Sequence, residues 1–571
     1  MTLSMTDKHL AMRTCSVVGL TLILLFLFLL GIFLLIPFPI AFFQNIVNSQ
    51  VYLQKHKDGQ FPTATYFWSS LPATQYFTFY FFNVTNPDEV TYNGAKPNLV
   101  EVGPYTYAET EFKDFIEFLD NDRTVFFQNN KTWVYDPSRS CADCSYSDVV
   151  TLPNAAYMTV VYMKAQQNMS PLIALGADVL TLLLGEAPIR TVSMAGVLFE
   201  SYPDPFLALV NSNFTKTLLG ILGNPIQIPN VPAMGYFPNY NHTNDGNYTI
   251  KTGKDKSNNM ALIQSWSNLT HLPWWSSDDA RDLRNSGDGT FQRPGLQKSD
   301  RLKQFQSFTC RHFYLSYSGR EESVNGIPAY QFAMEPDTYD SVKQRGYRYE
   351  NIEKVDYFPN WPCGPNHTRF LDGNCQVDCS AGENLCNRCC NGSYVNGTYL
   401  LPQGIVPLRC LPGQLVPLPF AGFLSPPHFL WSPKEVTTSL PGLAPDENKH
   451  HPGMFNINPL TGSTVGAIFR MQLSVPIYLS FDFTQASNLA NSFLPSFWLE
   501  INIEMRDYAV SYIKFNTVAL PKIILGVGIA LVAITTILLL VGIFIVIRKR
   551  RQRIPKQVET VARANTSWST S

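Results

Sequence analysis

None of the short motifs that mark common catalytic or nucleotide-binding sites occurs in this sequence of 571 residues. A Gly-rich phosphate loop, a nucleophile elbow and an HExxH zinc motif are absent, and no internal repeat is found. The histidines between 367 and 451 are scattered, so neither a metal cage nor a catalytic base stands out. These absences predict a protein that is not an enzyme, with no catalytic residues, no metal and no cofactor.

A basic surface of the kind that binds nucleic acid is also missing. The formal net charge is −1, from 43 Lys and Arg against 44 Asp and Glu. The two ends of the chain hold 9 of the basic and 2 of the acidic residues, which leaves the part between them at −8. Because nucleic acid binding needs a basic face, we expect no nucleic acid partner.

Charge is absent from Val17–Ile36, where nothing is more polar than Thr21. A helix of these twenty residues spans roughly 30 Å, the thickness of the hydrocarbon core of a bilayer. A secretory signal has a shorter apolar region of about 7–15 residues, followed by a cleavage site. Here PFPIAFF follows instead, so the stretch is predicted to be an uncleaved membrane anchor.

A second charge-free stretch, Ile523–Ile547, stops at the basic run RKRRQR. Clustered Lys and Arg hold the adjacent helix end in the cytoplasm, and the basic residues before the first span do the same. Both termini are therefore predicted to be cytoplasmic. The expected segments are an N-terminal tail 1–16, a transmembrane helix 17–40, an extracellular or lumenal domain 41–520, a transmembrane helix 521–547 and a basic tail 548–571.

N-glycosylation sequons support this topology, because all but one fall in the segment predicted to lie outside. The exception, Asn565, is in the basic tail and should stay bare. The ten expected sites are Asn83, Asn130, Asn168, Asn213, Asn241, Asn247, Asn268, Asn366, Asn391 and Asn396.

Of the 11 cysteines, Cys15 lies at the inner edge of the first span, where it is either palmitoylated or an inert lipid-facing residue. The ten others lie in the outer segment, and in an oxidising compartment they are predicted to form disulfides. Cys141 and Cys144 form a CxxC; a local disulfide or two separate bridges fit this context better than a redox pair. In the Cys-rich segment 363–410, disulfides are favoured over zinc, since paired CxxC motifs are missing. Its cysteines are Cys363, Cys375, Cys379, Cys386, Cys389, Cys390 and Cys410.

Alternating aromatic and polar residues predict strands over much of the outer segment. TQYFTFYFFNVT is one, LVEVG is expected to end at Pro104, and two further strands are joined by an NDR turn. The alternation indicates an antiparallel sheet with one buried face.

Between 153 and 222 the pattern becomes helical, with Ser170 as cap, Pro171 at the first position and Gly185 as stop. The apolar interior LIALGADVLTLLL is too short to span a membrane. It is either a buried core helix or an exposed apolar helix that contacts lipid or a lipid-carrying particle.

Several blocks, in order along the chain, resemble the class B scavenger receptor family, which includes the fatty-acid translocase and lysosomal integral membrane protein type 2. The resemblance covers essentially the whole chain. The blocks are FFNVTNPDEV, KPNLVEVGPYTYAE (Lys96–Glu109), ESYPDPFLALV (Glu200–Val210), FPNYNHTNDGNYTIKTGKD (Phe237–Asp255), CRHFYLSYSGREESVNGIPAYQF (Cys310–Phe332), PPHFL (Pro426–Leu430) and NPLTGSTVGAIFRMQ (Asn458–Gln472).

The resemblance implies an α+β fold: two terminal transmembrane helices flank one ectodomain with an irregular antiparallel β-barrel core, a helical apex and an internal lipid tunnel. The helical apex falls at 153–222, which favours the exposed interpretation of the apolar helix. The resemblance also implies a bridge between Cys310 and Cys410 and leaves the other pairings open. Candidate ligand residues at the apex are Leu172, Leu175, Leu180, Leu183 and Lys164, with Arg190 and Lys216 as further cations that are otherwise ordinary surface charges.

The expected function is that of a cell-surface receptor that binds lipids, fatty acids or sterols and lipoprotein-like or anionic particles, and mediates lipid transfer or uptake. The tail has neither a dileucine nor a tyrosine, which favours the plasma membrane over the endolysosomal membrane. The alternatives are a trafficking receptor for a lumenal protein and a channel subunit of similar topology. Gly526 and Ala530 in the second span indicate a possible homo-oligomer.

Overall fold

The computed structural model describes residues 5–36, 44, 47 and 51–566, except for 214, 216, 218–233, 238–239, 341–342, isolated positions between 348 and 356, most of 359–400, 412 and 416. The chain divides into two compact units. One, here called the ectodomain, comprises Val51–Val510. The other, the membrane unit, comprises Met1–Gln50 and Ser511–Ser571.

One large antiparallel sheet of 13 strands organises the ectodomain, with the order β7-β6-β3-β2-β1-β19-β18-β17-β10-β9-β8 and a branch from β18 to β16 and β15. The strands are β1 (Ala73–Val84), β2 (Leu99–Leu119), β3 (Thr124–Tyr135), β6 (Thr243–Lys251), β7 (Ile263–Trp266), β8 (Arg301–Gln306), β9 (Arg311–Val324), β10 (Ile327–Met334), β15 (Val406–Cys410), β16 (Pro417–Ser425), β17 (Gly453–Ile457), β18 (Thr464–Ile477) and β19 (Ser492–Met505). The mixed helix and sheet architecture predicted from the sequence is confirmed.

The two edge strands of this sheet, β7 and β8, are joined through a short segment at 285–287. On one side, the amide of Ile263 donates to the carbonyl of Ser286 at 2.8 Å. On the other, the amide of Gly287 donates to the carbonyl of Lys303 at 2.7 Å. Backbone hydrogen bonds therefore run around the sheet from edge to edge, so the expected barrel core is closed by 285–287 and not by a direct pairing of strands.

Alternate residues of β1 point to opposite faces of the sheet, so its aromatic residues face the core, as expected for an antiparallel strand with one buried face. Phe77, Phe79 and Phe81 point into the core with at most 1% of their surface exposed. The expectation that the next strand ends at Pro104 was wrong, because β2 continues to Leu119. The register against β1 shifts between Phe79 and Phe81 at this point, and such a bulge tolerates a proline that cannot donate a hydrogen bond.

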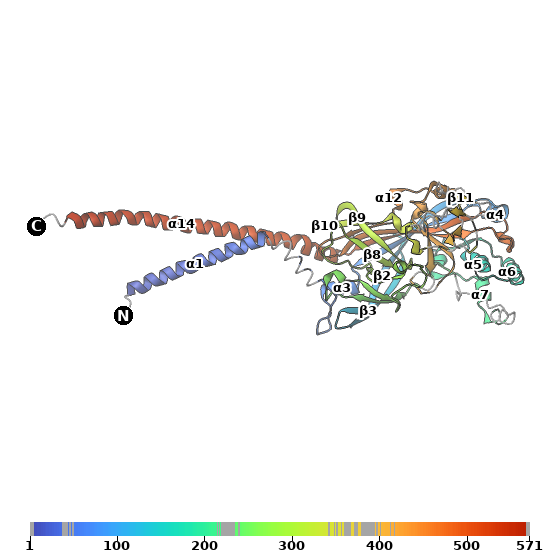
Figure 1. Cartoon of the computed structure of the whole chain (residues 1–571), viewed down its shortest axis with the longest axis horizontal. Helices are drawn as coiled ribbons and strands as arrows, with labels where there is room; N and C mark the ends of the chain where they lie inside the picture. The colour runs from blue at the N-terminus through green and yellow to red at the C-terminus, as the bar shows by residue number, and fades with distance from the viewer. Residues whose placement is uncertain are drawn as a thin grey trace. The chain divides into compact units, whose positions relative to one another are not determined.

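Helices gather at one end of the ectodomain, where α5, α6 and α7 lie, whereas α3 and the β9–β10 hairpin lie at the other end (Figure 1). The helices are α3 (Thr63–Ser69), α4 (Pro87–Asn93), α5 (Ala155–Gln166), α6 (Pro171–Leu183), α7 (Pro205–Val210), α9 (Asp278–Arg281), α11 (Lys434–Thr437), α12 (Glu447–His450) and a π-helical turn at Gly196–Glu200. Short paired strands complete the unit: β4 (Val149–Pro153) with β5 (Ile189–Ser193), β11 (His367–Arg369) with β12 (Cys375–Val377), and β13 (Tyr394–Val395) with β14 (Thr398–Tyr399).

The membrane unit contains α1 (Met5–Leu35) and α14 (Leu520–Thr566), the latter preceded by α13 (Asp507–Lys514) and a π-helical turn at Phe515–Ala519. The segments Val18–Leu35 and Asp507–Lys549 are long and apolar enough to cross a membrane. The two helices touch at glycines: a Cβ on Gly31 would lie 2.8 Å from Cγ2 of Val532. Small residues that let backbones approach closely are typical of packed membrane helices.

Candidate functional site

Helix α6 exposes several of its large apolar side chains and buries two polar ones, Asp178 and Thr181. Leu172 is 73% exposed and Leu183 is 78% exposed, and Leu175 is exposed beside them. The buried face consists of Ala174, Asp178 and Thr181. In a helix that only packs on a core, large apolar side chains face inward and charged ones outward, so the exposed leucines give α6 an outward apolar surface. The apolar face of α6 is defined here as Leu172, Leu175, Val179, Leu182 and Leu183.

The start and stop signals of α6 lie where the sequence predicts them. The Ser170 hydroxyl accepts a hydrogen bond from the amide of Ile173, Pro171 occupies the first turn, and Gly185 has a φ of +69° just beyond the end. These local signals fix the length of the helix. They carry no information on which face turns outward, and Leu180, expected at the apex surface, is partly buried and packs against the core.

Asp178 decides that orientation. Its carboxylate accepts hydrogen bonds from the amide and the hydroxyl of Thr484, each at 2.7 Å. Thr484 begins the 3₁₀ helix Thr484–Ala486, in the connection between β18 and β19. The same connection carries Phe481, which is 85% exposed. Phe481 was not predicted from the sequence, because only this tertiary contact brings its segment, distant in the chain, against α6.

The cations expected near the apex are engaged by carboxylates. Lys164 Nζ lies 3.7 Å from Asp482 Oδ2. Arg190 lies 3.1 Å from Glu186 and 2.9 Å from Asp204. Lys216 lies outside the described residues. Lys164 and Arg190 therefore hold loops and helices of the apex together, and neither is a free partner for an anionic ligand.

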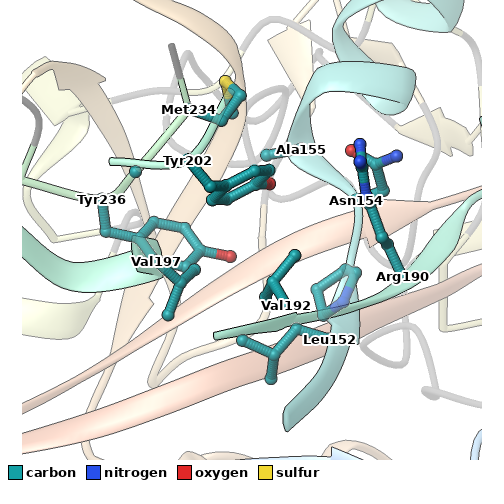
Figure 2. Close-up of a pocket in the computed structure, with 11 residues that line it drawn as sticks. Leu152, Asn154, Ala155, Arg190, Val192, Val197, Tyr202, Met234 and Tyr236 are labelled. Carbon is teal, nitrogen blue, oxygen red and sulfur yellow. The ribbon is translucent and has the colours of Figure 1, made fainter. Parts of the chain in front are cut away.

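A pocket lies beneath the apex, lined by residues of β4, α5, β5 and the segments around Tyr202 and Tyr236. Figure 2 shows the two tyrosine rings on one side, the guanidinium of Arg190 and the carboxamide of Asn154 on the other, and Leu152 and Val192 below. Only about 10 Å³ is open to the centre of a water molecule. The pocket as it stands has room for about one water and not for a lipid.

Aromatic side chains fill the core below this pocket. The ring of Phe79 lies 5.9 Å from that of Phe237 and 5.5 Å from that of Phe497. These rings belong to the larger of the hydrophobic clusters in the ectodomain. Among the described residues, this apolar region reaches from the helical end of the ectodomain into the sheet.

A layer of buried charges separates this cluster from a second one; the charge layer is defined as Glu109, Glu111, Lys113, Lys131 and Asp245. Lys131 Nζ lies 3.2 Å from Glu111 and 3.6 Å from both Glu109 and Asp245. Burial alone would lower the pKa of Lys131, but the surrounding carboxylates raise it well above its usual value. Lys131 lies over the ring of Phe308 in the first cluster, and Lys113 over that of Trp68 in the second.

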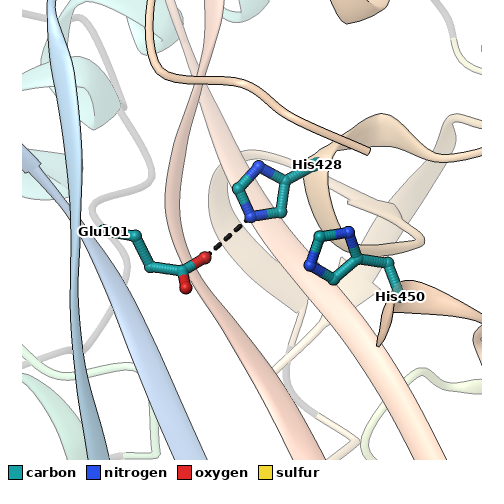
Figure 3. Close-up of side chains that lie close together, drawn as sticks. All are labelled: Glu101, His428 and His450. Atoms are coloured by element: carbon teal, nitrogen blue, oxygen red, sulfur yellow. Dashed lines mark hydrogen bonds and ion pairs between the residues drawn. The ribbon is translucent and has the colours of Figure 1, made fainter. Parts of the chain in front are cut away.

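A further cluster, Glu101 with His428 and His450, has the composition of a metal site (Figure 3). Backbone amides of Ala444 and Asp446 donate to Nδ1 of His428 and of His450, each at 3.0 Å. A ring nitrogen that accepts a hydrogen bond is unprotonated, so each neutral ring carries its proton on Nε2. An Nε2–H has no lone pair for a metal, and the Nε2 of His428 instead donates to Glu101 at 2.7 Å.

This cluster fixes the loop around His428. Burial would raise the pKa of Glu101, but hydrogen bonds from His428, Trp498 and Lys449 lower it to about 2. His428, Phe429 and Trp431 have φ values between 54° and 72°, which is strained for residues other than glycine. The anchored carboxylate of Glu101 holds this strained segment in place, so the cluster has a structural role.

The structure forms the bridges Cys141–Cys144 and Cys310–Cys410. Cys375 lies on β12, whereas Cys363, Cys379, Cys386, Cys389 and Cys390 lie outside the described residues. Of the expected glycosylation sites, Asn168, Asn213 and Asn268 are exposed and Asn83, Asn130, Asn241 and Asn247 are partly exposed on strands or their ends. Asn366, Asn391 and Asn396 lie outside the described residues.

Comparison with known proteins shows which proteins this chain is similar to. An uncharacterized protein of Caenorhabditis elegans is 34% identical over 87% of this chain and 91% of its own length. Lysosome membrane protein 2 of Rattus norvegicus is 27% identical over 81% of this chain and 83% of its own. Scavenger receptor class B member 1 of Mus musculus is 27% identical over 85% of this chain and 81% of its own length. The profile of the CD36 family matches residues 20–546, and the chain therefore belongs to that family.

Proposed function

We propose that this protein is a membrane-anchored lipid receptor that binds lipids or lipid-bearing particles at the apolar face of α6 and passes lipid toward the bilayer. The observation that carries the proposal is the exposure of the apolar face of α6, whereas the polar side chains of Asp178 and Thr181 are buried. Full burial of one leucine side chain is worth about 1.5–3 kcal/mol. A surface that leaves several leucines in water gains affinity for any apolar partner that covers them.

The names of two relatives, a scavenger receptor and a lysosome membrane protein, support a membrane receptor. No covalent step is part of this function, so it needs neither catalytic residues nor a cofactor. The ligand classes proposed are fatty acids, sterols and lipoprotein-like particles. The plasma membrane is the proposed location, because the tail lacks dileucine and tyrosine sorting signals.

An internal route for lipid is part of the proposal. An apolar passage shelters an acyl chain from water at about 0.8 kcal/mol per CH₂ group. We propose that this route passes through the pocket of Figure 2 and the aromatic core around Phe79. Side chains must move to open it. Because the charge layer is costly to cross for an acyl chain, we expect the lipid to leave the core before it reaches Lys131.

Uptake by cells that display the protein tests this proposal. Leu183→Glu places a charge on the apolar face, at a side chain that packs against little. We expect saturable uptake of a fluorescent fatty acid and of a lipoprotein, and an apparent affinity reduced at least about tenfold by the substitution. Gln166→Glu is the matched control, because it adds the same charge at an exposed position of α5.

Staining of intact cells must show equal amounts of the wild type, Leu183→Glu and Gln166→Glu at the cell surface. Equal uptake by the wild type and Leu183→Glu would show that the apolar face of α6 is not needed for lipid uptake. Uptake no better than in cells without the protein would overturn the lipid receptor for these ligands. Capture of a lumenal protein that is lost in Leu183→Glu would then support the trafficking receptor.

A further inference from the structure

Most of the buried cations of the ectodomain lie beside carboxylates. Among the described residues, the lysines and arginines with less than a tenth of their surface exposed are Lys113, Lys131, Arg311 and Arg470. Lys113 and Lys131 belong to the charge layer, and Arg470 Nε lies 2.7 Å from a carboxylate oxygen of Glu500. A buried charge is costly unless an opposite charge accompanies it. Arg311 is the exception.

No carboxylate neutralises Arg311 among the residues that the structure describes. Arg311 begins β9 and is 2% exposed. Burial lowers the pKa of its guanidinium, and the groups that oppose this effect are Tyr347 and Tyr339, which are uncharged at neutral pH. Because an arginine stays protonated in proteins, a full positive charge lies in the interior without a negative partner.

The guanidinium of Arg311 also has donors that are not used. Its Nη2 donates to the carbonyl of Thr338 at 2.8 Å and to Oε1 of Gln344 at 3.2 Å. The ring of Tyr347 covers one face, with its centroid 3.8 Å from Cζ. In the described part of the chain, Nε and Nη1 have no acceptor, and neither has the hydroxyl of Thr338. Two residues in direct contact thus keep unsatisfied buried donors next to an uncompensated charge.

An anion accounts for both features of this place. A water molecule can accept a hydrogen bond from these donors, but it leaves the charge of Arg311 unbalanced. The surroundings limit the size of the anion, since Thr338, Tyr339 and Tyr347 are each at most 4% exposed. A phosphate or a fatty-acid carboxylate brings several oxygens or a long chain into this enclosed region. A halide is a single atom and accepts charge-assisted hydrogen bonds from N–H and O–H groups.

We propose that Arg311 binds a chloride ion, which accepts hydrogen bonds from its guanidinium and from the hydroxyl of Thr338. The ion balances the buried charge. It also ties the 3₁₀ turn Pro336–Tyr339, which follows β10, to the start of β9 beside the Cys310–Cys410 bridge. This inference concerns neither the apolar face of α6 nor the lipid route, and it does not depend on the lipid-receptor function.

Replacement of gluconate by chloride at constant ionic strength tests the site in the purified full-length chain, because gluconate is too large for an enclosed site. We expect the apparent melting temperature of the wild type to rise by about 1–2 °C for each tenfold increase in chloride above its Kd, since an ion that binds only the folded chain stabilises it by mass action. Arg311→Gln removes the cation and should abolish this dependence. Arg301→Gln is the matched control and should keep it, because Arg301 already lies 2.6 Å from Glu335.

Thr338→Val gives a second test that keeps the buried arginine. Loss of the hydroxyl should raise the chloride concentration needed for the same stabilisation at least about threefold. Crystals of the full-length chain soaked in bromide should show an anomalous peak beside Arg311. A melting temperature that does not depend on chloride, or that depends on it equally in the wild type and Arg311→Gln, would overturn the proposal. Bromide-soaked crystals without a peak beside Arg311 would do the same.

Discussion

Lys131 shows how one residue constrains the interior of this ectodomain. It is surrounded by the carboxylates of Glu109, Glu111 and Asp245, of which Glu109 and Asp245 are buried and Glu111 is largely so. Burial raises the pKa of Glu109, although Lys131 opposes this effect. In the sequence, Lys131 lies in the strand segment NNKTWVY, where alternation alone does not distinguish an inward lysine from an outward one. The register of β3 against β2 and β6 decides it.

Replacement of Lys131 by methionine should destabilise the protein strongly. The substitution keeps the volume of the side chain but leaves buried carboxylates without their cation, which costs about 3–5 kcal/mol. Lys254→Met is the control, because it breaks an exposed pair with Asp122 worth about 0–1 kcal/mol. Chemical denaturation of the purified chain measures the free energy of unfolding of each variant. A loss for Lys131→Met no larger than that for Lys254→Met would show that the charge layer is not held by Lys131.

At the scale of helices, the ends were predictable and the orientation was not. The boundaries of α6 follow from Ser170, Pro171 and Gly185, which act within a few residues of one another. Its outward face follows from Asp178 and Thr484, which are 306 residues apart in the chain. The same limit applies to the two apolar helices of the membrane unit. The sequence indicates a homo-oligomer from Gly526 and Ala530, which stays a prediction, and carries no sign that Gly31 and Gly528 make the contact between α1 and α14.

That contact predicts a specific disulfide. A Cβ on Gly31 would lie 3.1 Å from Cβ of Leu531, close to the spacing of about 3.5–4.5 Å in a disulfide. Gly31→Cys with Leu531→Cys, in a chain with Cys15→Ser, should therefore cross-link on oxidation. Protease sites inserted after Gln50 and before Ser511 release the two helices, which should then migrate together on a non-reducing gel.

Gly19→Cys with Leu531→Cys is the control, because a Cβ on Gly19 has no atom within 4 Å. Separate migration of the helices from the Gly31 pair, or equal cross-linking of both pairs, would contradict the contact.

The whole molecule is expected to be a hairpin in the membrane, with the ectodomain between two spans. The distribution of charge predicts this arrangement, since Lys and Arg cluster beyond the second span and the segment between the spans is mildly acidic. The two apolar helices and the match to the CD36 family over 20–546 support a membrane protein.

Tags at the two termini test this topology. Antibodies should reach either tag only after the cells are permeabilised, because both basic ends are expected in the cytoplasm. Mass spectrometry of the purified chain should find glycans among the ten outer sequons and none at Asn565. A tag that is accessible on intact cells, or a glycan on Asn565, would overturn the predicted orientation.

The sequence by itself determined the two apolar helices, the antiparallel strands, the caps of α6 and the family, because these depend on residues close together or on blocks in a fixed order. Only the tertiary structure decided that α6 turns its leucines outward, that Phe481 belongs to the apex and that Lys131 lies in a buried charge layer. It also decided that the barrel closes through 285–287. Each of these results from contacts between distant parts of the chain, on which local periodicity carries no information.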